Sequence, residues 1–236
     1  MNGKKDGVLM VCYACLLVIG GLLTWLKYDY NTVKMEDVRE ACGYVSASAT
    51  PVEAPKIALT FDDGPSAAWT PALLDGLKER GVKATFFLIG ENADKNPEIV
   101  KRMAEEGHLI GNHTYHHVEL TKVTEKEARS ELADTNAVIV RITGKEPEYM
   151  RPPFGAWQRK LEQEIRMLPV LWTIDPLDWT TENQDEIVNK VVTEAEENDI
   201  ILLHDCYKSS VEAGLRIVDI LQEEGFVFVT VDELLL

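Results

Sequence analysis

The sequence predicts an α/β protein built on a parallel β-sheet, and two observations lead to this fold class. From Lys56 onward, short apolar runs alternate with amphipathic segments that are long enough for helices. Gly81, Gly107 and Gly225 each end a predicted helix, as a left-handed C-terminal cap requires. No glycine-rich phosphate loop follows the first strand, which disfavours nucleotide binding. Strands that alternate with helices imply parallel pairing through right-handed crossovers.

The apolar runs predict strands at 56–61, 84–89, 108–111, 148–150, 169–174, 199–203 and 226–229. The amphipathic segments predict helices at 70–80, 96–106, 124–142, 156–167, 185–197 and 210–224. Thr124 to Glu127 match a capping box, so the third helix should begin there. The units either close into a barrel or lie open as a doubly wound sheet. In both architectures, functional side chains gather at the C-terminal ends of the strands.

The N-terminal part differs from the rest of the chain. Residues 8–26 form a nearly uninterrupted apolar run of 19 residues, after a leader at 1–7 that contains two lysines. A helix of this length spans a bilayer of about 30 Å. We expect an uncleaved signal anchor rather than a cleaved signal peptide, because the nearest small-x-small site lies far downstream. A polar linker at 27–54 then connects the anchor to a domain at 55–236 outside the cell.

Composition narrows the classes of partner. The net charge of −16 disfavours nucleic acid and anionic membrane surfaces. The hydrophobic content of 45% supports a folded core. Cys12 and Cys15 lie within the apolar run, and the spacing of Cys42 and Cys206 predicts neither a disulfide nor a zinc finger. We therefore expect free thiols.

Two adjacent carboxylates, Asp62 and Asp63, come directly after the first predicted strand, which Gly64 and Pro65 end. A turn allows neighbouring side chains to converge on one site. Two carboxylates held close together are costly unless a cation or a hydrogen-bond donor lies between them. On these residues alone, an Asp-Asp turn that caps the next helix remains an equal alternative.

His113 and His117 follow the third predicted strand and are four residues apart. On one helical turn they would face the same way and present two imidazoles to a metal ion, while His116 would point elsewhere. With an aspartate from another strand end they form a two-histidine, one-aspartate site. Zinc suits such a site, and the same ligands also hold non-haem iron. A solvated histidine-rich turn is the alternative.

The segment from Arg151 to Gly155 also follows a predicted strand. Its two prolines fix the path of the loop and remove two backbone donors. The N–H of Phe154 or of Gly155 is then free to act as an oxyanion donor. Arg151 can pair with a carboxylate and keep it ionised. The structural alternative is a rigid turn with a surface arginine.

Two more clusters stand at strand ends, at 175–179 and 202–205. A histidine such as His204, beside a carboxylate from a neighbouring strand, suits a general acid. Trp179 and Leu202 can form an apolar wall for a small methyl group, or can belong to the core. Each cluster alone is moderate evidence for a site, and the five together are strong evidence.

Together the five clusters resemble the polysaccharide deacetylase family, also called the NodB-homology or carbohydrate esterase family 4 domain. The family pattern is TFDDG, H-[ST]-x-x-H, a motif like R-x-P-[YF]-G, D-x-x-D-W and L-x-H. The chain matches this pattern at 60–64, 113–117, 151–155, 175–179 and 202–204. The match covers about 56–206, in a domain that runs to the end of the chain. The one visible departure is Phe154, where many members have tyrosine.

The resemblance implies a distorted (β/α) barrel of about seven strands that binds one divalent metal ion, usually zinc, with cobalt and nickel as alternatives. By motif position, the metal ligands are expected to be Asp63, His113 and His117. Asp62 is expected to be the general base that takes a proton from metal-bound water, and Arg151 is expected to orient it.

The resemblance also implies roles on the other side of the site. His204 is expected to be the general acid, paired with Asp175. The backbone N–H of Phe154 takes the place of the oxyanion donor, and Trp179 and Leu202 take the place of the pocket for the acetyl methyl group. Because the donor at Phe154 is a main-chain group, we expect little loss from the missing tyrosine hydroxyl.

We therefore expect a membrane-tethered, metal-dependent N-deacetylase that acts on amino-sugar polymers outside the cell. Peptidoglycan N-acetylglucosamine is the leading substrate, while chitin oligomers, an exopolysaccharide and the acetyl esters of xylan remain open. A catalytically silent glycan-binding module and a metal-dependent oxygenase are the rival readings. We expect a monomer that binds no nucleic acid.

Overall fold

The structure, a computed structural model, describes residues 54–157 and 165–235. The expected leader, the expected transmembrane helix and nearly all of the linker lie outside these ranges, as do Cys42 and most of the predicted helix at 156–167. Within the two ranges, no helix combines the length and the apolar character needed to span a bilayer. Cys206 is a free thiol.

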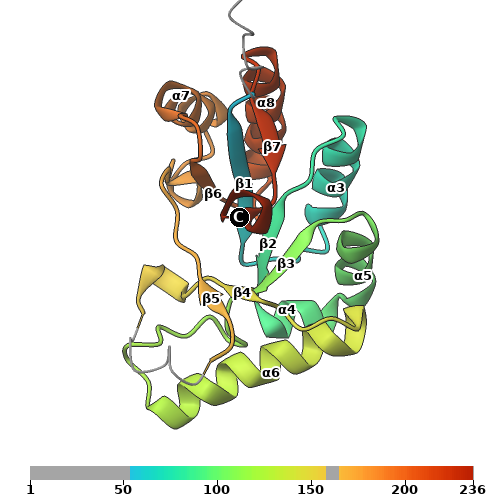
Figure 1. Ribbon diagram of the computed structural model, residues 1–236, viewed down its shortest axis with the longest axis vertical. Coiled ribbons are helices and arrows are strands. Elements are labelled where there is room, and N and C mark those ends of the chain that lie inside the picture. Colours follow the sequence, from blue (N-terminus) through green and yellow to red (C-terminus); the bar gives the residue numbers. More distant parts are fainter. Residues whose placement is uncertain (1–53, 158–164, 236) are drawn as a thin grey trace, which may run out of the picture. The chain divides into compact units, whose positions relative to one another are not determined.

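Within the described ranges, a parallel sheet of seven strands forms the centre of the fold (Figure 1). The strands are β1 Lys56–Asp62, β2 Thr85–Leu88, β3 Leu109–Asn112, β4 Tyr149–Met150, β5 Leu168–Pro169, β6 Ile200–His204 and β7 Val227–Val229. Their order is β5-β4-β3-β2-β1-β6, and β7 pairs with the start of β1. The predicted parallel sheet is confirmed, and it curls into a half-barrel.

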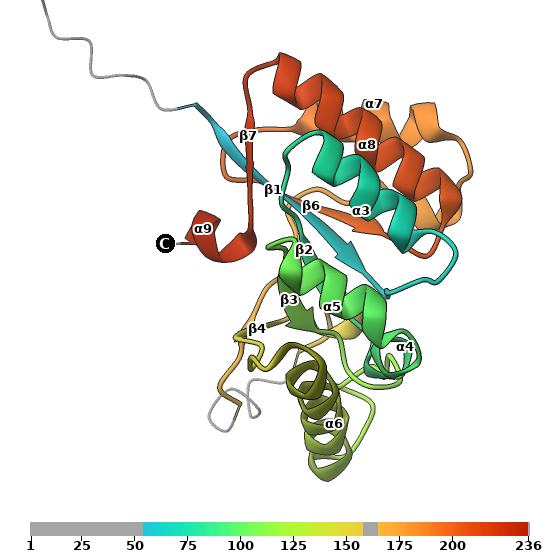
Figure 2. The ribbon, with the colours of Figure 1, turned by 90° about the vertical axis from the view of Figure 1, so that its right-hand side faces the viewer.

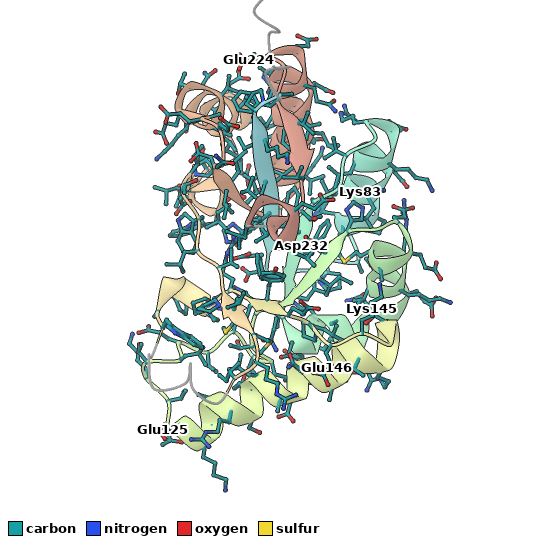
Figure 3. The ribbon with its side chains drawn as sticks, viewed as in Figure 1. Lys83, Glu125, Lys145, Glu146, Glu224 and Asp232 are labelled. Atoms are coloured by element: carbon teal, nitrogen blue, oxygen red, sulfur yellow. The ribbon has the colours of Figure 1, made fainter. Side chains whose placement is uncertain are left out.

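The helices lie on the outer side of the curled sheet, except the last, whose Val231 packs with Ala58 in the inner cluster (Figures 1 and 2). They are α3 Thr70–Glu79, α4 Gly90–Lys95, α5 Pro97–Glu105, α6 Glu125–Thr143, α7 Gln184–Glu194, α8 Lys208–Glu223 and α9 Val231–Leu235. The capping box predicted for α6 is present, because the side chains of Thr124 and Glu127 each bond the other's backbone N–H. Glu125 begins this long helix, and Lys145 and Glu146 lie just past its other end (Figure 3).

The side chains of β1 alternate between an apolar outer face of the sheet and an inner face that becomes polar. Ile57, Leu59 and Phe61 are fully buried in the large core that joins the sheet to the outer helices. The side chains of the residues between them point to the other face of the sheet, because successive side chains of a strand alternate between the two faces. On this inner face, the small Ala58 is followed by the buried polar residues Thr60 and Asp62. The concave side of the sheet is therefore polar toward its C-terminal edge.

The sequence and the structure differ at three elements, one of which is the last helix α9, which the sequence did not predict. The predicted helix at 96–106 is preceded by the separate helix α4, and Asn96 lies between α4 and α5. Of the predicted strand at 169–174, only Pro169 lies in a regular strand, as the last residue of β5. At its other end, Ile174 forms a single isolated bridge with Ile201 of β6. The chain after β5 thus crosses to β6 and brings the fourth cluster beside the fifth.

Candidate active site

A cavity of about 410 Å³ opens at the C-terminal edge of the sheet. The ends of β1, β3 and β6 each deliver polar side chains to it, as the sequence predicts for a parallel sheet. The cavity is lined by Asp62, Asp63, His113, His117, Phe154, Trp172, Asp175, Trp179, Leu202, His204 and Tyr207. Every predicted site residue except Arg151 lines this one cavity.

Asp63, His113 and His117 converge at the cavity floor, and their ligand atoms all lie within 4.8 Å of one another. The Nε2 atoms of His113 and His117 lie 3.4 and 3.3 Å from Oδ1 of Asp63. That oxygen is buried and has no hydrogen-bond partner. A buried carboxylate oxygen without a donor is costly, and a divalent cation between the three groups would satisfy it. Two imidazoles and one carboxylate are a suitable donor set for zinc.

The two histidines do not share a helical turn, so that part of the sequence interpretation is wrong. Residues 113–118 form an irregular loop, in which Thr114 has φ 63° and His117 has φ 57°. Asp63 also has a positive φ, of 72°. Backbone in this left-handed region costs about 1 to 3 kcal/mol per non-glycine residue and persists where surrounding contacts enforce it. The loop, rather than helical spacing, turns both imidazole rings toward Asp63.

Groups around the three candidate ligands fix their orientation. Nδ1 of His113 lies 2.7 Å from the carbonyl oxygen of Arg151 and donates its proton there, which leaves the Nε2 lone pair facing the cavity. The side-chain amide of Asn92 donates to the backbone carbonyl of Asp63 at 2.8 Å. His116 instead contacts Glu131 at 2.8 Å on the exposed side of the loop, as expected for the histidine that points elsewhere.

The electrostatic environment favours the ligand forms of Asp63 and of His117. Burial alone would raise the pKa of Asp63, but the close contact with Nε2 of His113 and the nearby ring of His117 hold that pKa below its ordinary value. Burial lowers the pKa of His117, and the charge of His113 acts in the same direction. An ionised aspartate and a neutral imidazole are the protonation states that bind a metal ion.

Asp62 lies beside this cluster, and the buried Arg151 holds it by a hydrogen bond. Nη1 of Arg151 donates to Oδ1 of Asp62 at 2.8 Å and to the hydroxyl of Thr60 at 2.7 Å. The arginine has no exposed surface, and its guanidinium lies 4.3 Å from the centre of the Phe87 ring. The other oxygen of Asp62 lies 3.7 Å from Nε2 of His113. Arg151 therefore fixes one oxygen of Asp62 and leaves the other at the cavity.

The predicted pairing of His204 with Asp175 is wrong, because His204 pairs with Asp178. Nδ1 of His204 lies 2.8 Å from Oδ1 of Asp178, and the backbone N–H of His204 donates to Oδ2 at 2.8 Å. Asp175 instead accepts the backbone N–H of Leu177, at 2.8 Å, within its own loop. Leu177 has φ 58°, and this turn carries Asp178 inward while Asp175 stays at the cavity wall.

The charge around His204 favours its protonated form. Burial alone would lower its pKa, but the hydrogen bond and charge of Asp178, with the charges of Asp62 and Asp63, raise the pKa of His204 to about 9. A histidine that holds its proton at neutral pH and opens onto a cavity can act as a proton donor.

Apolar groups and one backbone donor complete the cavity. The Gly155 N–H donates to the carbonyl of Pro152 at 3.0 Å, which leaves the N–H of Phe154 as the candidate donor of this turn. Phe154 has φ 61°, and its ring lies 4.8 Å from the ring of His117. Trp179 and Leu202 both line the cavity, the first exposed and the second buried.

Three functional residues were missed by sequence reasoning. Asp178 was inside a recognised cluster, and only the loop geometry distinguishes it from Asp175. Asn92 supports Asp63 from a helix that the sequence did not predict as a separate element. Tyr207 lines the cavity beside His204, and its position three residues after a predicted site histidine was the available signal.

A family model described as polysaccharide deacetylase matches residues 49–171 of the chain. Among curated relatives, a peptidoglycan-N-acetylglucosamine deacetylase of Bacillus cereus is 43% identical over 79% of this chain and 70% of its own length. The peptidoglycan-N-acetylmuramic acid deacetylase PdaC of Bacillus subtilis is 40% identical over 75% of this chain. The chain spans 38% of the length of PdaC, and 45% of the length of the peptidoglycan-N-acetylglucosamine deacetylase PgdA of Listeria monocytogenes.

A solved structure of the peptidoglycan deacetylase PdaC from Bacillus subtilis superposes on this chain with a TM-score of 0.76. The two chains are 40% identical, and the match covers 77% of this chain and 90% of that one. This match covers a larger share of the chain than the family model does. Sequence, fold and motif residues agree, and the chain belongs to the polysaccharide deacetylase family.

Proposed function

We propose that this polysaccharide deacetylase is a metal-dependent hydrolase that removes N-acetyl groups from peptidoglycan, with N-acetylglucosamine as the preferred sugar. One observation carries the proposal: Asp63, His113 and His117 converge beside Asp62, in a cavity that His204 also lines. This is the set of groups that hydrolysis of an unreactive amide needs, namely a cation site, a base and an acid. The names of the relatives support peptidoglycan as the polymer.

The three candidate ligands would hold a cation that acts as a Lewis acid. A divalent ion held by Asp63, His113 and His117 would polarise the acetyl carbonyl and lower the pKa of a bound water to near neutrality. Zinc suits two imidazoles and one carboxylate, and cobalt or nickel can replace it at such a site. Asp63 and the two histidines would contribute three ligands, and such a site would keep a position open for water or substrate.

Asp62 and His204 move the protons of the reaction. Asp62 accepts a proton from the water whose oxygen attacks the acetyl carbon, and its bond with Arg151 keeps the free carboxylate oxygen aimed at the cavity. A carbon–oxygen bond forms first, and the carbon–nitrogen bond then breaks. His204 gives its proton to the departing nitrogen, so that acetate and a free amine leave. Asp178 keeps His204 in the orientation and protonation state for this step.

The rest of the cavity suits the acetyl group and the sugar ring. The N–H of Phe154 is a candidate donor to the developing oxyanion. Trp179 and Leu202 offer an apolar wall for the acetyl methyl group. Exposed aromatic rings of Phe154, Trp179 and Tyr207 surround the opening. Flat aromatic faces with polar neighbours suit sugar rings, which have apolar C–H faces and polar edges.

Acetate release tests this proposal. The zinc-loaded protein should release acetate from peptidoglycan faster than from chitin oligomers or acetylxylan, and a chelator should abolish the release until zinc or cobalt is added back. Mass spectrometry of the digested glycan then identifies which sugar carries the free amine, N-acetylglucosamine or N-acetylmuramic acid. A silent glycan-binding module would bind the polymer and release no acetate from any substrate, although Asp62 and His204 are both intact.

We also propose that residues 8–26 anchor the catalytic domain to the outer face of the cell membrane. The apolar run and the polar linker support this location. Membrane fractionation of cells that produce the full chain provides the test, combined with protease added outside the cells. The domain should stay with the membrane and should be digested by the external protease. Recovery in the soluble cytoplasmic fraction would refute the anchor.

A further inference from the structure

Asp205, the residue after His204, is a buried carboxylate for which the proposed chemistry has no use. It has no exposed surface, and its Oδ2 accepts a hydrogen bond from the hydroxyl of Thr70 at 2.5 Å. Its Oδ1 is buried and has no hydrogen-bond partner. Burial raises the pKa of Asp205 to about 7, against the opposing effect of Thr70. A buried carboxylate costs stability, so its presence beside the active site calls for a function.

The Asp205 carboxylate lies directly against the backbone of Gly64. A Cβ atom added to Gly64 would lie 2.3 Å from both carboxylate oxygens. Gly64 follows Asp63, so the carboxylate packs against the turn that presents the candidate aspartate ligand. Glycine is needed at this position because any side chain would displace either the turn or Asp205.

Thr70 extends this contact along the same loop. Its hydroxyl donates to Asp205 and accepts the backbone N–H of Ser66 at 2.7 Å. The parallel ladder between β1 and β6 ends at the pair Asp62 and His204. Beyond that pair the chains leave the sheet, and Asp205 together with Thr70 continues the connection between them.

The other side of the turn has its own attachments. The backbone N–H of Ile89 donates to the carbonyl of Gly64 at 3.1 Å, and Asn92 donates to the carbonyl of Asp63. These bonds tie the turn to β2 and α4. Asp205 and Thr70 tie it to β6. The turn is therefore clamped from both sides, although its residue Asp63 has a left-handed backbone that costs energy.

We propose that Asp205 is a positioning residue: its carboxylate holds the turn from Asp63 to Ser66 against the end of β6. Through this contact it keeps Asp63 aimed at the two histidines and keeps Asp62 at a fixed separation from His204. The inference rests on the proposed function for its catalytic consequence, and on geometry alone for its effect on metal affinity. Groups that orient metal ligands in this way are typically worth 10-fold to 100-fold in affinity or activity.

The experiment compares variants of the full chain in zinc affinity and in acetate release. Asp205→Ala and Thr70→Val should each weaken zinc binding, measured by competition with a chelator, by about 10-fold. Each should lower kcat by a similar factor and leave KM within about 2-fold, because the turn and not the sugar site has moved. The conservative variants Asp205→Asn and Thr70→Ser keep a hydrogen bond between the two positions and should recover most of the zinc affinity.

Thr85→Val is the matched control. Thr85 is as buried as Thr70, and its hydroxyl accepts the backbone N–H of Val231 at the start of β2, outside the turn from Asp63 to Ser66. Loss of this bond should lower the melting temperature about as much as Thr70→Val does, with zinc affinity and kcat unchanged. If Asp205→Ala does not fold, Thr70→Val decides the question.

A double-mutant cycle tests the contact with Gly64. Gly64→Ala should weaken zinc binding because the new methyl group meets the carboxylate, and Asp205→Ala in the same chain should restore part of the loss. Zinc affinity within 2-fold of wild type in both folded Asp205→Ala and Thr70→Val would overturn the proposal. Failure of the wild-type chain to release acetate would instead refute the proposed function, while the zinc measurements would still decide the role of Asp205.

Discussion

His204 and Asp178 form a two-point contact, in which Asp178 accepts both the ring Nδ1 proton and the backbone N–H of His204 at 2.8 Å each. Both carboxylate oxygens of Asp178 are therefore engaged by one residue. The contact fixes the ring so that its other nitrogen faces the cavity. A proton donor to the leaving amine needs this orientation.

Replacement of Asp178 should therefore impair turnover far more than replacement of Asp175. Asp178→Asn removes the charge that holds the proton on His204, and we expect kcat to fall by about 100-fold or more. Asp175→Asn is the matched control, since it changes the other carboxylate of the same loop and should cost at least 10-fold less. Rates of acetate release under saturating substrate provide the comparison. Equal losses in the two variants would contradict the assignment of Asp178.

The dependence of turnover on pH follows from the same contact. Because the pKa of His204 is raised to about 9, its acidic form persists at neutral pH, and kcat should fall as pH rises above about 9. The stability that this pair contributes is fully present below pH 6.5 and is lost as pH rises through about 9. In Asp178→Asn the alkaline limb of the kcat profile should move to lower pH. An unchanged limb would show that another group supplies the proton.

Removal of only one partner of the buried ion pair between Arg151 and Asp62 should destabilise the fold strongly. Arg151→Met leaves a buried carboxylate without its partner and should lower the free energy of unfolding by about 3 to 5 kcal/mol. Adding Asp62→Asn to that variant removes the unpaired charge and should recover part of the loss. Urea unfolding of both single variants and of the double variant measures this coupling. Additive losses would show that the two side chains do not interact.

His108 should make the fold sensitive to acid. Its Nδ1 accepts the backbone N–H of Ala84 at 3.1 Å, so the proton of the neutral ring lies on Nε2, which is buried and has no partner. Burial and the charge of Lys83 lower the pKa of His108 from 6.5 to about 4. Because the unfolded chain binds more protons between these values, stability is full above pH 6.5 and falls by about 3 kcal/mol toward pH 4.

The variant His108→Asn keeps an acceptor for Ala84 and removes the titrating ring. Urea unfolding at pH 7 and at pH 4.5 should show a smaller acid loss in this variant than in the wild-type chain. His116→Asn serves as the control, because His116 is exposed and should leave the acid loss unchanged. The same acid loss in both variants would exclude His108 as its source.

Much of the fold was predictable because the strands are short, mainly apolar runs between recognisable helices. The placement of the site followed from this pattern, since Asp62, His113 and His204 stand at the ends of parallel strands. Local spacing was a weaker guide. The interval between His113 and His117 suggested a helical turn, but the left-handed backbone of Thr114 and His117 produces the convergence instead.

The choice between Asp175 and Asp178 shows the same limit of the sequence. Both carboxylates stand in one motif, and each would suit a proton donor as a partner. The left-handed turn at Leu177 decides which of them reaches His204, and nothing in the residue types of the motif predicts it. The support of Asp63 by Asn92 and of its turn by Asp205 likewise depends on contacts between distant segments.

The most direct measurement is the zinc content of the purified chain and of variants at the candidate site. Wild type and His116→Ala should each bind one zinc ion per chain, because His116 faces Glu131 outside the cavity. Asp63→Ala and His113→Ala should retain their fold and lose tight zinc binding, because each removes one of three ligands. One tightly bound zinc ion in both of these variants, as in wild type, would contradict the metal site on which the account rests.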